Sequence, residues 1–288
     1  LSAFNMLETA DWTATSRANS DPDWPGNGNT LHSVPGAHRH NNFEDYVHED
    51  LLGTRQVLNG GAMRYACGRG WFGQHASITT WKEKLQAQLD EAFLDFQKAL
   101  NTFGIRFSQQ KFTVAKLSLT KSQHANAVAK GKAFNTHVVS MWLLKVFEEK
   151  QDADIESQMI CTSLWGFCSI WNVAMDVKRR DSIICTDAEV EELRTARRAA
   201  FGALRWLAGN AHAKNLARFH LKPKFHQLDH CLRRCIRTQI IFSAFWVFKQ
   251  EDSMGKWSKV GLKVHASVVC SRVLDRWLAL FVIPSDEV

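Results

Sequence analysis

The chain has 288 residues, a hydrophobic fraction of 45% and a formal net charge of +7 at pH 7. This hydrophobic fraction excludes a wholly disordered protein, and the length allows one large domain or two small ones. The positive charge favours a polyanionic partner such as DNA, and it is also compatible with an ordinary soluble surface.

The seven cysteines form an odd set that contains no C-x-x-C pair. They predict neither a disulfide scaffold nor a zinc ribbon, and they favour a reducing, intracellular compartment. The longest apolar stretch, residues 240–248, is too short to span a bilayer, and no charged leader precedes an apolar run at the start. We therefore expect a fragment of a longer product, without a membrane partner.

The first 42 residues are polar and rich in Asn, Asp, Ser and Gly, which predicts mostly loop. Residues 43–47 alternate apolar and polar side chains like a short strand, and residues 51–58 have helical spacing. Asp45 and His48 then lie at the strand end, from which side chains reach into a site. The alternative is that Asp45 caps the next helix and His48 is an ordinary loop histidine.

Glycines 68, 70 and 73 surround the basic Arg69 and predict a loop, with a phosphate-binding turn as the alternative. Residues 80–83 form a capping box that opens a helix, and the helical spacing of apolar residues continues until Gly104. Residues 105–119 are strand-like and predict a hairpin.

From residue 122 onward the pattern is helical, with segments at 124–150, 154–177 and 186–210. The second is apolar on most faces and is expected to be buried. The third has a basic side that includes Arg194, Arg198 and Arg205. Such a face either follows phosphates or is simply solvated.

The most basic region spans residues 212–237. Its candidate nucleic-acid contacts are Lys222, Lys224, Arg233, Arg234 and Arg237. If residues 225–237 are helical, His226 and His230 lie one turn apart with the spacing of a metal-binding pair. Zinc would need two further ligands, so the alternative is two histidines bonded to backbone or carboxylate groups. A last helix begins at Glu251 and Asp252, where its dipole favours acids.

Three short blocks in this order resemble those of the large transposases of eukaryotic DNA transposons, including CACTA-type elements, and of proteins derived from them. The first block is Leu31-His32-x-Val34-Pro35-Gly36, then Asp45-x-x-His48-x-x-x-Leu52-Gly53, then Gly60; the second is Lys222-Pro223-Lys224-Phe225-His226-x-x-x-His230; the third is Glu251-Asp252-x-x-Gly255. Val47 stands where the family has Met or Leu, and Gly60-Gly61 replaces a Gly-Ser or Gly-Asn pair.

The resemblance implies a ribonuclease-H-like nuclease in which three carboxylates hold two Mg²⁺ or Mn²⁺ ions for DNA cleavage and joining. It assigns Asp45, Glu251 and Asp252 as catalytic, with Asp45 and Glu251 as metal ligands. His48, His226 and His230 are auxiliary. The residues before Asp45 offer no aspartate on a strand pattern, so the first acid lies upstream or the chain is an inactive copy.

We therefore predict an α+β, predominantly helical protein. Residues 1–42 are mostly loop, residues 43–121 a partial ribonuclease-H-like segment, and residues 122–288 a helical region packed on it. Three functions remain open: a catalytically incomplete transposase derivative, a noncatalytic helical module that binds nucleic acid, and a helical interaction or scaffold protein. A DNA partner is consistent with a nuclear location.

Overall fold

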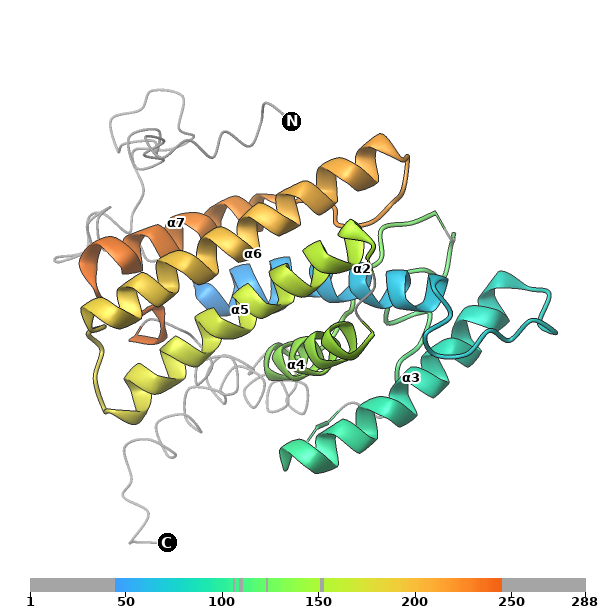
Figure 1. Cartoon of the computed structure of the whole chain (residues 1–288), viewed down its shortest axis with the longest axis horizontal. Coiled ribbons are helices and arrows are strands. Elements are labelled where there is room, and N and C mark those ends of the chain that lie inside the picture. Colours follow the sequence, from blue (N-terminus) through green and yellow to red (C-terminus); the bar gives the residue numbers. More distant parts are fainter. Residues whose placement is uncertain (1–44, 106, 109–110, 123, 151–152, 245–288) are drawn as a thin grey trace, which may run out of the picture. The chain divides into compact units, whose positions relative to one another are not determined.

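The computed structural model describes residues 45–244, except 106, 109, 110, 123, 151 and 152 (Figure 1). These residues fall within one compact unit and are predominantly helical, as predicted. The elements are the π-helix η3 (Val47–Thr54), α2 (Arg55–Gly68), α3 (Trp81–Phe103), α4 (Ala133–Glu149), α5 (Ile155–Arg179), α6 (Asp187–Ala213), α7 (Pro223–Thr238) and the short 3₁₀ helix η4 (Phe242–Ala244).

The strands predicted near 43–47 and 105–119 are not found among the described residues, whose one β-type pairing is an isolated bridge between Ile184 and Ile240. Residues 46 and 47 begin a helical segment instead. In the second region, the Gln86 side chain of α3 donates to the Phe112 carbonyl and accepts from the Val114 amide. Backbone bonds within the segment, such as that from the Leu119 amide to the Val114 carbonyl, form turns, and the segment stays irregular.

The predicted helix ends are largely confirmed. Thr80 caps α3 through the Glu83 amide, and Gly104, with φ of +64°, ends it. Thr186 and Glu189 form a complete capping box at the start of α6. The helix predicted from residue 124 begins only at Ala133. The preceding residues are held in an irregular path by backbone bonds such as that from the Ala129 amide to the Gln56 carbonyl.

The glycine-rich segment after α2 is a helix ending and offers no phosphate cradle. The Gly70 amide donates to the Cys67 carbonyl and the Trp71 amide to the Ala66 carbonyl, the two bonds of a Schellman motif. Gly70 has φ of +69°, which a side chain would disfavour. Because these amides are occupied within the chain, they do not form the phosphate-binding turn that was the alternative.

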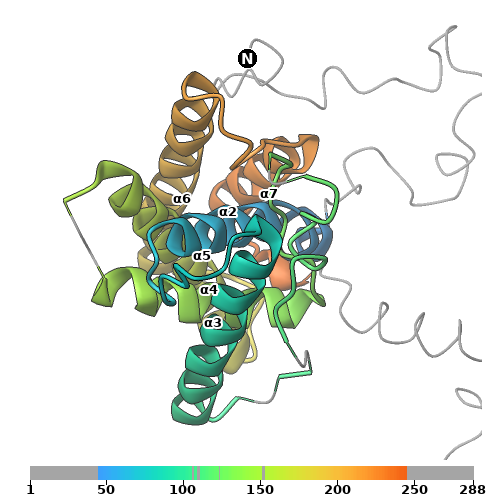
Figure 2. The same ribbon diagram turned by 90° about the vertical axis from the view of Figure 1, so that its right-hand side faces the viewer.

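Aromatic contacts join the helices into one core. Helices α5 and α6 lie side by side, with α7 next to α6 and α2 crossing close to α5 (Figures 1 and 2). Phe201 of α6 lies with its ring centre 5.7 Å from that of Phe167 in α5 and 4.7 Å from that of Phe225 in α7. At the edge formed by α3, Phe96 contacts Trp142 of α4 at 5.3 Å.

The close approach of α5 and α6 depends on Gly166. A Cβ atom at this position would lie 2.6 Å from the Ala196 carbonyl oxygen and 2.7 Å from the Ala200 amide nitrogen of α6. Both are backbone atoms, which cannot move aside as a flexible side chain would. A methyl group at residue 166 therefore has to push the two helices apart.

We expect Gly166→Ala to lower the free energy of unfolding by about 1–3 kcal/mol, because overpacking outweighs the gain in helix propensity. The matched control is Gly202→Ala in α6, where a Cβ atom would meet nothing within 4 Å. That change should raise the free energy of unfolding by up to about 1 kcal/mol. Urea denaturation followed by circular dichroism measures both, and equal effects would disprove the close-packing explanation.

Candidate functional site at the contact of η3 and α7

A fully buried arginine fixes η3 against the helical core. Arg55, whose side chain has no exposed surface, donates from Nε and Nη2 to the two carboxylate oxygens of Asp50 at 3.1 and 2.5 Å. Its Nη2 also donates to the Tyr46 hydroxyl at 3.2 Å and to the Phe167 carbonyl at 2.9 Å. Its Nη1 lies 2.7 Å from Nδ1 of His137. One guanidinium group therefore connects η3 with α4 and α5.

The charge states in this cluster follow from burial. Burial alone would lower the pKa of Arg55, but the negative charge of Asp50 and the neighbouring Tyr46 outweigh it, and the net shift is upward. Burial, followed by the charge of Arg55, lowers the pKa of His137 well below its usual range. His137 is therefore neutral, and its Nδ1 accepts a hydrogen bond from the guanidinium group.

At the start of η3, Asp45 makes two local contacts. Its Oδ1 accepts the Val47 amide at 3.1 Å, and its Oδ2 pairs with Nδ1 of His48. The His48 side chain is 44% exposed. Asp45 thus organises the beginning of η3 and orients a surface histidine, an arrangement that a metal- or phosphate-binding role would also use.

Lys224 of α7 connects the first two sequence blocks. Its Nζ donates to the His48 carbonyl at 3.0 Å, across 176 positions of sequence. Its side chain also crosses Gly53, where a Cβ atom would lie 2.7 Å from the Lys224 Cδ and 2.8 Å from the His48 carbonyl oxygen. The lysine of one block therefore occupies the space left by the glycine of the other.

The two histidines of α7 lie on one face, as their spacing predicted. The Nε2 atoms of His226 and His230 are 3.0 Å apart, and the ring planes are nearly perpendicular. Cys231 and Cys235 are buried on the core side of the helix. Among the described residues, no group of three or more His, Cys, Asp or Glu side chains is placed to hold a metal ion. Zinc at the histidine pair stays an untested alternative.

Several predicted nucleic-acid contacts have partners within the protein. Arg233 donates to Asp229 at 2.8 Å, and Arg197 of α6 donates to the other oxygen of this buried carboxylate at 2.7 Å. Arg194 pairs with Glu191. The remaining predicted contacts differ in exposure: Lys222, Arg198 and Arg237 are exposed, whereas Lys224 and Arg234 are half-buried. The α6–α7 surface is therefore partly a structural clamp and partly a set of exposed cationic side chains.

The predicted catalytic acids Glu251 and Asp252 lie outside the described residues. Their distance from Asp45, and with it the three-carboxylate cluster, stays a prediction. Sequence patterns missed the Arg55 cluster altogether. The one signal is the pair Asp50 and Arg55, and a spacing of five residues does not bring side chains together in an α-helix.

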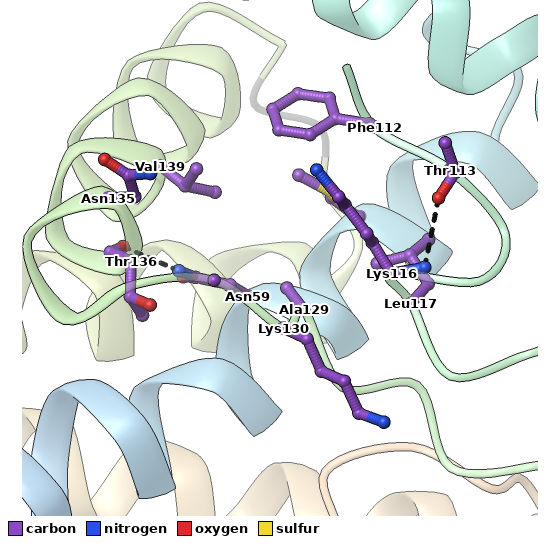
Figure 3. Close-up of a pocket in the computed structure, with 12 residues that line it drawn as sticks. Asn59, Phe112, Thr113, Lys116, Leu117, Ala129, Lys130, Asn135, Thr136 and Val139 are labelled. Carbon is purple, nitrogen blue, oxygen red and sulfur yellow. Dashed lines mark hydrogen bonds between the residues drawn. The ribbon is translucent and has the colours of Figure 1, made fainter. Parts of the chain in front are cut away.

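A small cavity lies between α2, α4 and residues 112–131 (Figure 3). Its volume is about 20 Å³, enough for about one water molecule. On its wall the Asn59 amide donates to the Thr136 carbonyl at 2.9 Å and, on the opposite side, the Lys116 amide donates to the Thr113 hydroxyl at 3.1 Å. This cavity is too small for a substrate.

Comparison with known proteins finds no protein-family model, no curated protein and no solved structure that matches the chain. Within the described residues, every helix is either too short or too polar to cross a membrane. Functional inference therefore rests on the residues and their geometry.

We expect Arg55→Met to cost about 3–5 kcal/mol of unfolding free energy, because it leaves the Asp50 carboxylate buried without its cation. The double variant Asp50→Leu/Arg55→Met should cost less than the sum of its two single changes. The control is Arg180→Met, which removes an exposed pair with Glu189 and should cost less than about 1 kcal/mol. Chemical denaturation measures all four, and additive costs would contradict direct coupling.

The lowered pKa of His137 predicts a pH-dependent stability. The unfolded chain takes up a proton at this residue near its ordinary pKa of about 6.5, whereas the folded protein does not. Stability is therefore lost as the pH falls below about 6.5, by at most about 1.4 kcal/mol per pH unit for this group. His137→Asn should flatten the slope, and His212→Asn, at an exposed position of α6, should retain it. Identical slopes in all three proteins would exclude His137 as the cause.

Proposed function

We propose that this chain derives from a DNA-transposon transposase and that its helical part binds DNA without cleaving it. The contact of Lys224 with His48 and Gly53 is the observation that carries the proposal. The resemblance rests on short blocks, and short blocks that share no contact carry little weight. In this chain Lys224 of the second block packs against Gly53 and bonds to the His48 carbonyl of the first block, so the two blocks are in contact.

The charge distribution on α7 supports DNA as the partner. His226, His230, Arg233 and Arg237 recur at spacings of four, three and four residues, which places them along one stripe of the helix. Lys222 lies at the start of the same helix. The exposed cations Lys222 and Arg237 on this helix are of the kind that contacts the phosphates of a nucleic-acid backbone, and neutralising phosphates releases condensed counterions.

Helix α6 carries a second set of basic residues. Arg194, Arg198 and Arg205 lie on one stripe of α6 because they are separated by four and seven residues. The buried carboxylate of Asp229 binds Arg197 and Arg233, which holds α6 and α7 in a fixed relation. Two rigidly connected basic stripes bind a backbone with a smaller loss of side-chain entropy than independent helices would.

The ancestral chemistry in this proposal is metal-dependent cleavage and joining of DNA on a ribonuclease-H-like core. Asp45 and one of Glu251 and Asp252 would hold Mg²⁺ or Mn²⁺, with His48, His226 and His230 nearby. A two-metal site also needs a further acid, for which this sequence offers no strand-borne candidate before Asp45. We therefore propose DNA binding in the nucleus as the present function and regard the catalytic centre as incomplete.

A scaffold or interaction protein is the second candidate. The partners of Asp45, Arg194, Arg197 and Arg233 favour it, because each of these side chains has a structural contact that needs no ligand. The two functions differ in their response to DNA and salt, since a scaffold needs no polyanion.

Removing charge from α7 should weaken DNA binding. We expect the full chain to bind a fluorescent duplex at low salt, and Lys222→Gln/Arg237→Gln to reduce the affinity and the slope of log affinity against log salt by up to about one unit per lost phosphate contact. Both positions are exposed, so the fold should be retained. Fluorescence anisotropy across a salt series measures both quantities.

The matched control is Lys82→Gln/Lys98→Gln, which removes the same charge from exposed positions of α3. It should leave affinity and slope nearly unchanged. If the wild-type chain fails to bind at low salt, DNA binding is wrong and the scaffold function is favoured. Equal losses in both double variants would mean that net charge alone, and not the α7 surface, attracts DNA.

A further inference from the structure

A basic cavity of about 500 Å³ lies away from the contact of η3 and α7. It is open to solvent and is lined by the end of α2, the first turns of α3, His124 and residues 215–218, which follow α6. These elements lie toward the right-hand side of Figure 1. The volume is within the range of small-molecule sites, roughly 300–1,000 Å³.

The cavity wall is strongly cationic. Arg64, Lys84 and Arg218 all line it, and the described residues contribute no aspartate or glutamate to its lining. Neither Arg64 nor Lys84 forms an ion pair with any of the described residues, although salt bridges are common elsewhere in the chain. Positive charges that share a cavity repel one another, so an anion between them would be stabilised.

Arg218 is held in place from behind. Its Nη2 is 2.8 Å from the buried carboxylate of Glu156, and its guanidinium carbon lies 5.7 Å from the centre of the Tyr65 ring. The side chain is 16% exposed, and its Nε is buried without a hydrogen-bond acceptor among the described residues. An arginine fixed in this way presents its donors at little entropic cost, which suits recognition of a phosphate.

The protonated form of Arg64 is destabilised by its surroundings. Its burial on α2, together with the positive charge of Arg218, lowers the pKa of Arg64. The guanidinium groups of Arg64 and Arg218 thus place two like charges in the lining of one cavity. A bound anion would replace this repulsion with attraction to both groups.

The other lining residues indicate what the anion carries. Gln74 and Asn215 supply amide groups that donate and accept hydrogen bonds, and Trp81 supplies an aromatic ring. Stacking on an aromatic ring and hydrogen bonding to amides are how proteins bind nucleobases. We propose that this cavity binds the phosphate groups of a nucleotide, either free or at the end of a nucleic-acid strand.

Thermal unfolding of the full chain tests the site with ATP in the absence of magnesium, inorganic pyrophosphate, adenosine, and a 5′-phosphorylated single-stranded DNA oligonucleotide. A ligand that binds only the folded state raises the melting temperature. ATP and pyrophosphate should raise it, whereas adenosine should not. A response to ATP identifies a free nucleotide as a ligand, and a response to the oligonucleotide that is lost when its 5′-phosphate is removed identifies a strand end.

Arg64→Met/Lys84→Met should weaken binding of the responding ligand by about tenfold or more, because each lost charged hydrogen bond has at least that effect. Without ligand this variant should be no less stable than the wild type, since it removes repulsion. Arg218 is left intact because Glu156 would otherwise be buried without its partner. The control Lys98→Met/Lys150→Met removes the same number of positive charges at exposed positions outside the cavity and should bind like the wild type.

The proposal is overturned if neither phosphate compound nor the oligonucleotide shifts the melting temperature, if adenosine acts as strongly as ATP, or if the cavity variant binds like the wild type. Its failure is separable from failure of the α7 surface. Lys222→Gln/Arg237→Gln should retain the ATP or pyrophosphate response whether or not it loses affinity for duplex DNA.

Discussion

The buried guanidinium of Arg55 is the constraint on which the rest of this structure depends. A charge without exposed surface is tolerated only when its donors are satisfied and a counter-ion is present. The bonds to Asp50, Tyr46, His137 and Phe167 meet that requirement, but they come from η3, α4 and α5. Those elements must be in place together, so the cluster ties local geometry to tertiary packing.

The same pair explains why η3 is a π-helix. Asp50 and Arg55 are five residues apart, and in an α-helix they would point about 140° away from each other at 100° per residue. In a π-turn, residues five apart are hydrogen-bonded neighbours, and the Arg55 amide donates to the Asp50 carbonyl. The side-chain ion pair and the backbone bond thus select the same wide turn. That turn also sets the position of the His48 carbonyl, which accepts Lys224.

Features that depend on neighbouring residues could be predicted from the sequence, whereas features that depend on tertiary contacts could not. The caps at Thr80 and Thr186 and the stop at Gly104 are local chemistry, so the helices that they bound could be predicted. The strands predicted at 105–119 are not found, because backbone bonds such as that from the Leu119 amide to the Val114 carbonyl form turns there, and the Gln86 side chain bonds to the backbone of residues 112 and 114. No local pattern reveals a distant glutamine. Likewise, a helical pattern of 3.6 residues per turn does not predict the ion pair of Asp50 and Arg55, because that pair requires a π-turn.

In the candidate site, too, local spacing could be predicted and tertiary contacts could not. The pairing of His226 with His230 follows from helical spacing, but the fit of Lys224 over Gly53 needs the tertiary fold. The structural duties of Arg197 and Arg233 also depend on Asp229, which sequence patterns did not single out. Basic residues counted along the chain therefore overstate the number available to a ligand. The exposed Lys222, Arg198 and Arg237 are the better guide.

The α6–α7 surface and the basic cavity share one arrangement, in which a buried carboxylate binds two cationic side chains. Asp229 holds Arg197 and Arg233 at 2.7 and 2.8 Å, and Glu156 holds Arg218 and Lys214 at 2.8 and 3.5 Å. Neutralising one buried carboxylate takes one cation. The second cation adds one unit of positive charge that the carboxylate does not neutralise. Its side chain lost conformational entropy during folding, so that entropy need not be lost again when a ligand binds. The Arg55 cluster differs, because one guanidinium meets one carboxylate and the pair is sealed from solvent. The Arg55–Asp50 pair is therefore neutral overall and lies in the core. The clusters around Asp229 and Glu156 each carry one excess positive charge, so an anion is attracted to them and not to the Arg55 cluster.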